Sequence, residues 1–202
     1  MTLILADAWW KSMRPAMEER NLGTLADFDL ARIIADFGTR FLVETGTGSG
    51  GDVEFAAGFP FDHVYSIESS HKLAIQAAFR NARNQAMTIL HGRNGRGLKD
   101  VLNEIPAEAP VIYWLDSHPS AHDLEQDLRL IVSLRSASRD VFLIDDLRIY
   151  QDGDYGDGPC PPEQQIPPYR RNLEFVGELL GASHDISTMV QRTGYLCAFP
   201  RS

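Results

Sequence analysis

The chain has 202 residues, of which 44% are hydrophobic and 23% charged, a composition typical of one soluble globular domain. Its 28 acidic residues outnumber the 19 Lys and Arg, giving a formal net charge of -9. Such a chain repels phosphate backbones, and no apolar run approaches the roughly 20 residues of a membrane span. We therefore expect no nucleic-acid and no membrane partner. Two cysteines without metal-type spacing and the absence of a signal peptide indicate the cytoplasm.

Short apolar runs alternate along the chain with amphipathic segments, which is typical of a parallel sheet with helices on both faces. Two helices are predicted within residues 1–38, the second opened by a capping box of Thr24 with Asp27 and ended by Gly38. Helical segments then separate five predicted strands, at residues 40–44, 63–68, 87–91, 111–115 and 141–144. The predicted fold class is α/β, with a doubly wound sheet.

The C-terminal third has a different composition. Residues 151–168 are rich in Gly, Pro and Asp, and a loop of this length is a candidate lid beside a site. A helix ending at Gly181 follows, and the runs 185–191 and 195–199 flank a short turn that predicts an antiparallel hairpin. We expect one domain, residues 1–202, with a mostly parallel seven-stranded sheet.

The strongest local motif is the run Glu44-Thr-Gly46-Thr-Gly48-Ser-Gly50-Gly51, between the first strand and a helix. Glycines allow the backbone to approach a ligand closely, and the helix N-terminus offers unpaired N–H groups. The same run satisfies G-x-G-x-x-G, with Glu68 about 20 residues on as the acid for a ribose. A nicotinamide dinucleotide and a second kind of nucleoside cofactor therefore compete, and a glycine turn without a ligand is the third interpretation.

Glu44 favours a cationic ligand, because a nicotinamide site normally has an apolar residue at this position. The pattern Glu-x-Gly-x-Gly-x-Gly resembles the first motif of the class I S-adenosylmethionine (SAM)-dependent methyltransferases. This resemblance implies that Glu68 holds the ribose hydroxyls and that Gly92-Arg93-Asn94 borders the adenine. The SAM-binding residues it implies are Glu44, Thr45, Gly46, Gly48, Gly50, Glu68, Ser69, Gly92, Arg93, Asn94 and Asp116.

Acidic residues follow two further strands. Asp116 comes after the fourth strand, with His118 two residues on, and Asp145 and Asp146 come after the fifth. Ligands of open α/β sheets bind at the carboxyl ends of the strands, and three carboxylates there suit Mg²⁺. Alternatively, Asp116 caps the next helix and the other two are solvated. Adjacent acids on a strand point to opposite faces, so both reach one ion only if the backbone turns.

The arrangement resembles the cation-dependent O-methyltransferases of the catechol and macrocin types. The resemblance implies a divalent cation on Asp116, Asp145 and Asp146, with Asp116 and His118 as catalytic residues and His118 as the base. His118 can equally be an exposed turn residue. The chain is short before its first strand, where macrocin-type proteins carry substrate-covering elements.

We therefore expect a SAM-dependent and metal-dependent O-methyltransferase whose partner is a small hydroxylated molecule, a sugar or natural product. A SAM-binding accessory protein without turnover and a nicotinamide oxidoreductase remain as alternatives. The sequence does not decide the oligomeric state, a homodimer included.

Overall fold

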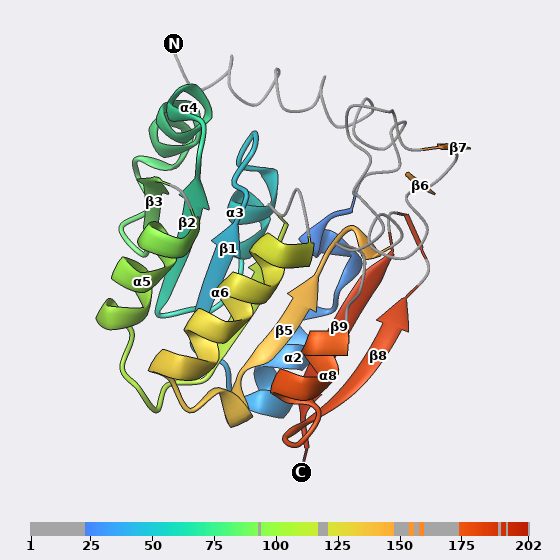
Figure 1. Ribbon diagram of the computed structural model, residues 1–202. Coiled ribbons are helices and arrows are strands. Elements are labelled where there is room, and N and C mark those ends of the chain that lie inside the picture. The colour runs from blue at the N-terminus through green and yellow to red at the C-terminus, as the bar shows by residue number, and fades with distance from the viewer. Residues whose placement is uncertain are drawn as a thin grey trace.

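A computed structural model describes residues 23–92, 94–116, 121–147, 154–155, 158–159, 174–189, 191–192 and 194–201. Its centre is a seven-stranded sheet in the order β3-β2-β1-β4-β5-β9-β8 (Figure 1). The strands are β1 Phe41–Thr45, β2 His63–Glu68, β3 Met87–His91, β4 Val111–Leu115, β5 Val141–Ile144, β8 His184–Met189 and β9 Tyr195–Pro200. Strands β1 to β5 pair in parallel, and β9 pairs antiparallel with both β5 and β8. The predicted mostly parallel sheet with a C-terminal hairpin is confirmed.

Helices cover both faces of the sheet, which makes it doubly wound. In Figure 1, α5, α6 and α8 lie in front of the strands, and α2 and α3 lie behind them. The helices are α2 Leu30–Phe37, α3 Gly51–Ala56, α4 His71–Asn81, α5 Asn94–Glu104, α6 Ala121–Leu134 and α8 Glu174–Leu180. Short 3-10 turns, η1 and η2, span Leu25–Asp27 and Ala137–Arg139, and β6 Asp154–Tyr155 pairs with β7 Gly158–Pro159. No helix in the part of the chain described here is long and apolar enough to cross a membrane.

Two apolar cores lie on the two faces of the sheet. The larger contains side chains of α5, α6 and α8, and the other contains side chains of η1, α2 and α3. In this second core, Trp114 packs edge-on against Phe28 at 5.9 Å between ring centroids and lies 6.0 Å from Tyr195. Each such aromatic pair contributes about 0.5–1.5 kcal/mol beyond its buried area. This packing fixes η1 against β4 and β9, near the carboxyl edge of the sheet.

The capping-box prediction for Thr24 and Asp27 is correct only in part. Thr24 is the N-cap of the short turn η1, where its side chain accepts a hydrogen bond from the Ala26 N–H, but the helix that Gly38 ends is α2, which begins at Leu30 with Asp29 as its N-cap. Asp27 does not accept a hydrogen bond from the Thr24 N–H, as a capping box would require. Its carboxylate instead accepts hydrogen bonds from Arg192 Nε and Tyr195 Oη, each at 2.6 Å. Gly38 does end the helix, in a left-handed conformation at φ 64°. The segment is therefore shaped by the distant hairpin more than by its own capping pattern.

Cys197 lies in the middle of β9 and is 1% exposed. Burial raises the pKa of its thiol to about 12, so almost no thiolate forms near neutral pH, and the thiolate is the reactive species. In a Cys160→Ser chain, we expect no reaction of the native protein with a disulfide reagent at pH 8. One full equivalent should react after denaturation. Rapid labelling of the native variant would contradict this burial.

Candidate active site

The glycine turn links β1 to α3 at the carboxyl edge of the sheet. Gly46, Gly48 and Gly50 all have positive φ, at 91°, 51° and 81°, a region that residues with a Cβ rarely adopt. Gly50 also lies against α4, where an added Cβ would come within 3.2 Å of the Ala77 Cβ. The turn therefore needs glycine for its shape, and its exposed backbone can lie close to a ligand.

Glu68 ends β2 and faces this turn. Its carboxylate accepts hydrogen bonds from the Gly48 N–H at 2.8 Å and the Ser70 N–H at 2.6 Å, with the Ser69 hydroxyl at 3.4 Å. On β3, His91 is the register partner of Glu68, and the Gly92 N–H donates to the Glu68 carbonyl at 2.9 Å. Glu68 is thus hydrogen-bonded to the glycine turn, and the ribose is predicted to bind beside it.

Glu44 lies beneath the turn and is 1% exposed. It accepts a hydrogen bond from the Ser66 hydroxyl, which also pairs with Thr47. Burial raises the pKa of Glu44 well above its ordinary value, and the charges of Asp52 and Glu68 raise it further. A buried carboxyl beside other acids is stabilised by a nearby cation, so this position suits a positively charged ligand.

Asp116, Asp145 and Asp146 lie together at the ends of β4 and β5. Burial raises the pKa of Asp116 well above its usual range, and the charges of Asp145 and Asp146 are the next causes. Burial and the charge of Asp145 raise the pKa of Asp146 to about 8. The chain turns sharply here, because Asp146 has φ 63°. The turn that the metal hypothesis requires is therefore present.

The chemistry of these donors fits a hard cation, but their placement does not yet make a coordination site. Among the residues described, no three His, Cys, Asp or Glu side chains are grouped so that they could hold a metal ion. Asp145 Oδ1 accepts a hydrogen bond from the Asp146 N–H at 2.7 Å. The Asp145 carboxylate also packs against Gly23. A shared ion would compete with these two contacts for the Asp145 carboxylate.

Gly23 is needed because the chain passes directly over Asp145. A Cβ at position 23 would overlap the Asp145 carboxylate. Gly23→Ala should therefore lower the free energy of unfolding by roughly 1–3 kcal/mol, the usual cost of overpacking. Gly177→Ala is the matched control: this exposed position in α8 has open space around it, and alanine favours a helix by about 1 kcal/mol. Denaturant unfolding measures both, and equal stability of the two variants would contradict the close contact.

Several expected site residues lie outside the described part of the chain. These are Arg93, His118 and most of the candidate lid at 151–168. Asn94 is described only as the first residue of α5. Thr45 is buried and ends β1. The roles of His118 as base and of Arg93 and Asn94 at the adenine stay predictions.

Asp52 is the residue of this region that sequence reasoning missed. It lies in the first turn of α3 and accepts hydrogen bonds from Thr24 Oγ1, the Leu25 N–H and Trp114 Nε1, at 2.7, 3.1 and 3.1 Å. Its charge also raises the pKa of both Glu44 and Asp116. The only signal in the sequence was an acid just after the last glycine of the turn, and this did not reveal its partners.

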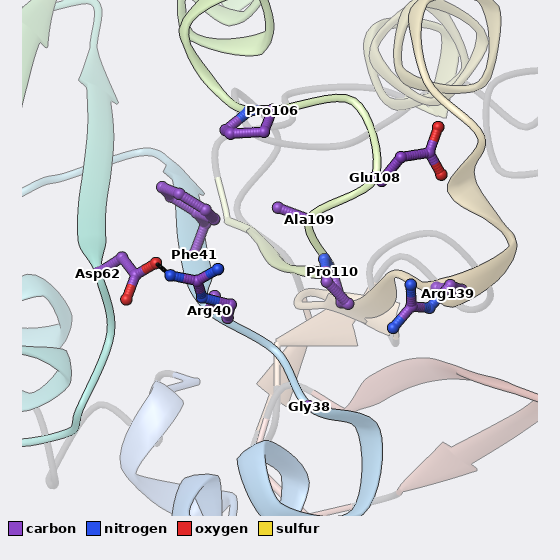
Figure 2. A pocket seen from close by; sticks show the side chains of 9 residues that line it. All are labelled: Gly38, Arg40, Phe41, Asp62, Pro106, Glu108, Ala109, Pro110 and Arg139. Carbon is purple, nitrogen blue, oxygen red and sulfur yellow. Dashed lines mark ion pairs between the residues drawn. The ribbon is translucent and has the colours of Figure 1, made fainter.

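A pocket of about 430 Å³ lies at the opposite, amino edge of the sheet (Figure 2). Arg40, which is ion-paired with Asp62, forms one side of it, and Glu108 and Arg139 lie on the other. Its two arginines and two acids balance in charge. Parallel α/β sheets bind ligands in the crevice outside the carboxyl ends of their strands. The candidate site is therefore that edge of the sheet and not this pocket, and its acids, Glu44, Glu68, Asp116, Asp145 and Asp146, are called the acidic crevice below.

Comparisons with known proteins bear on the fold of the chain. No family model and no curated protein matches the chain. Several solved structures are similar to it. A Staphylococcus aureus protein assigned as a caffeoyl-CoA O-methyltransferase aligns with a TM-score of 0.67 and 14% identity, over 95% of this chain and 91% of that one.

Two ligand-bound structures are also similar. The O-methyltransferase of Bacillus cereus in complex with S-adenosylhomocysteine (SAH) aligns with a TM-score of 0.60 and 18% identity, over 99% and 94% of the two chains. TomG of Streptomyces achromogenes, an O-methyltransferase of tomaymycin synthesis in complex with SAM, aligns with a TM-score of 0.56 and 18% identity, over 84% and 77%. The chain has the fold of the class I SAM-dependent methyltransferases.

Proposed function

We propose that this protein is a SAM-dependent O-methyltransferase that acts on a small hydroxylated molecule and uses a divalent cation. The observation that carries the proposal is the group of acids beside the glycine turn, on three adjacent strands. Glu44 is the residue before the last of β1, Glu68 ends β2, and Asp116 directly follows β4. SAM carries an ammonium and a sulfonium, and these cations match the buried carboxylates. The SAH and SAM complexes of the similar proteins support the same cofactor.

Each residue of the crevice has a part in this proposal. Glu68 binds the two ribose hydroxyls, in exchange for one of the N–H groups that it now accepts from. The backbone from Gly46 to Gly50 holds the methionine portion, with Glu44 below it. Asp116 lies at the next strand, so the sulfonium methyl is directed toward the ends of β4 and β5. The main contribution of the protein is to align the methyl group with the acceptor oxygen.

The cation belongs on the acceptor side of the crevice. Asp116, Asp145 and Asp146 are the residues that would hold it, and Mg²⁺ is the ion that an oxygen donor set of this kind prefers. When bound, such an ion lowers the pKa of a coordinated hydroxyl. The acceptor oxygen would form a bond to the methyl carbon as the C–S bond breaks with its electron pair left on sulfur, and the acceptor proton would pass to water or to His118.

A thermal-shift comparison of SAM, SAH and NAD, with and without Mg²⁺, tests the cofactor. A ligand at 100 times its Kd adds about 2.7 kcal/mol to native stability. We expect SAM and SAH to raise the Tm and NAD to leave it unchanged. Stabilisation by NAD alone would support an oxidoreductase instead.

Turnover is tested separately with SAM labelled in its methyl group and a library of sugars, phenols and other hydroxylated compounds. We expect transfer of the label to at least one hydroxyl acceptor. SAM binding without transfer to any acceptor would favour the accessory SAM-binding protein.

A further inference from the structure

Asp52 connects the crevice to the chain segment before α2. Its carboxylate accepts three hydrogen bonds, from Thr24, Leu25 and the Trp114 indole. Thr24 caps η1 and Leu25 is its first residue, whereas Trp114 lies in β4, two residues before Asp116. These contacts fix the position of the carboxylate, so that its charge acts on the site from one defined direction.

The charge of Asp52 is costly in this position unless a cation compensates it. Burial raises its pKa, and its three hydrogen-bond donors oppose that rise and favour the ionised form. The same charge raises the pKa of Glu44, where it is the largest cause after burial, and of Asp116. Three neighbouring carboxylates therefore destabilise one another in the absence of a positive ligand.

We infer that Asp52 is a positioning residue that makes the site prefer the cationic cofactor SAM over its neutral-sulfur product SAH. The inference rests on the proposed function. Asp52 acts through the electrostatic potential around Glu44 and Asp116 and by holding η1 against α3. Methyl transfer leaves the C–S bonding pair on sulfur, so the sulfonium becomes a neutral thioether. The product thereby loses the part of the attraction that acts on the sulfonium and keeps the part that acts on the ammonium, and its release becomes easier.

Asp52→Asn tests this role because it removes the charge and keeps the size of the side chain. Thr24→Val is the comparison variant, since it removes one of the three hydrogen bonds to Asp52 and keeps the carboxyl group with its two other donors. The Kd values of SAM and SAH are measured for each protein by calorimetry in the presence of a chelator. Both variants should be less stable than the wild type, because both lose contacts between η1 and α3.

The ratio of the two Kd values separates an electrostatic role from a structural one. We expect Asp52→Asn to reduce the preference for SAM over SAH about three- to tenfold, the scale of one partly screened charge interaction. Thr24→Val should change that ratio less than Asp52→Asn does, because the Asp52 carboxyl group and two of its three donors remain. If Asp52→Asn does not fold, Asp52→Ser removes the same charge and can still accept from the Leu25 N–H.

Two other outcomes would overturn the inference in distinguishable ways. Equal weakening of SAM and SAH by the charge-removing variant would show that Asp52 only holds η1 in place, while the proposed function stands. A wild-type protein that binds neither SAM nor SAH would overturn the proposed function and this inference with it.

Discussion

Replacing Glu68 with alanine should weaken SAM binding about 10- to 150-fold, because the vicinal hydroxyls of the ribose lose a charged acceptor worth roughly 1.5–3 kcal/mol. The loss has a second source. Glu68 also holds the N–H groups of Gly48 and Ser70, and alanine leaves the glycine turn without that support. Titration calorimetry gives the affinity, and Glu68→Gln, which keeps an acceptor oxygen, should lose less than the alanine variant.

Glu104→Ala is the control for this experiment, because it removes an exposed carboxylate at the far end of α5. Its SAM affinity should equal that of the wild type. Unchanged SAM affinity in Glu68→Ala would mean that the ribose does not bind at the end of β2. A large fall in Tm for Glu68→Ala without a change in affinity would assign the carboxylate to the turn alone.

Most of the sheet could be predicted from the sequence, because a buried strand is a local signal. Four strands, β2 to β5, have the predicted bounds. The first strand begins and ends one residue later than predicted. Thr45, which is part of the glycine motif, belongs to the strand and pairs with both Ile67 and Leu115. Pairing with β2 on one side and β4 on the other extends β1 into the glycine motif. No pattern within residues 40–45 indicates which strands lie beside it.

The missed parts of the site depend on contacts between distant residues. Asp52 accepts a hydrogen bond from Trp114, which lies 62 positions along the chain. Asp27 accepts one from Tyr195, at a separation of 168 positions. Gly23 is required by Asp145, which comes from the fifth strand. Sequence patterns describe a few consecutive residues at a time. The predicted strands therefore located the acids at their ends, but no pattern indicated the segment that packs against those acids.

The cation should be essential for turnover and not for SAM binding. The charges of Asp145 and Asp146 raise the pKa of Asp116, and the charge of Asp145 raises the pKa of Asp146, and a divalent cation would relieve that repulsion. Asp146→Asn tests one proposed ligand. Asparagine tolerates the left-handed backbone at φ 63°, so the turn after β5 should persist. Above pH 8, where Asp146 of the wild type is ionised, the metal-free variant should be at least as stable as the wild type, since one of the repelling charges is gone.

Activity should change in the opposite direction. With one carboxylate fewer, Asp146→Asn should need at least tenfold more Mg²⁺ for half-maximal turnover, a loss of about 1.4 kcal/mol in metal binding. Asp185→Asn, which removes an exposed charge in β8 that is ion-paired with Arg201, should respond to Mg²⁺ as the wild type does. Methylation is measured after exhaustive chelation and again after Mg²⁺ is restored. Full activity without metal would exclude the cation from the mechanism, and activation of the acceptor hydroxyl would then have to come from a side chain, with His118 the candidate base.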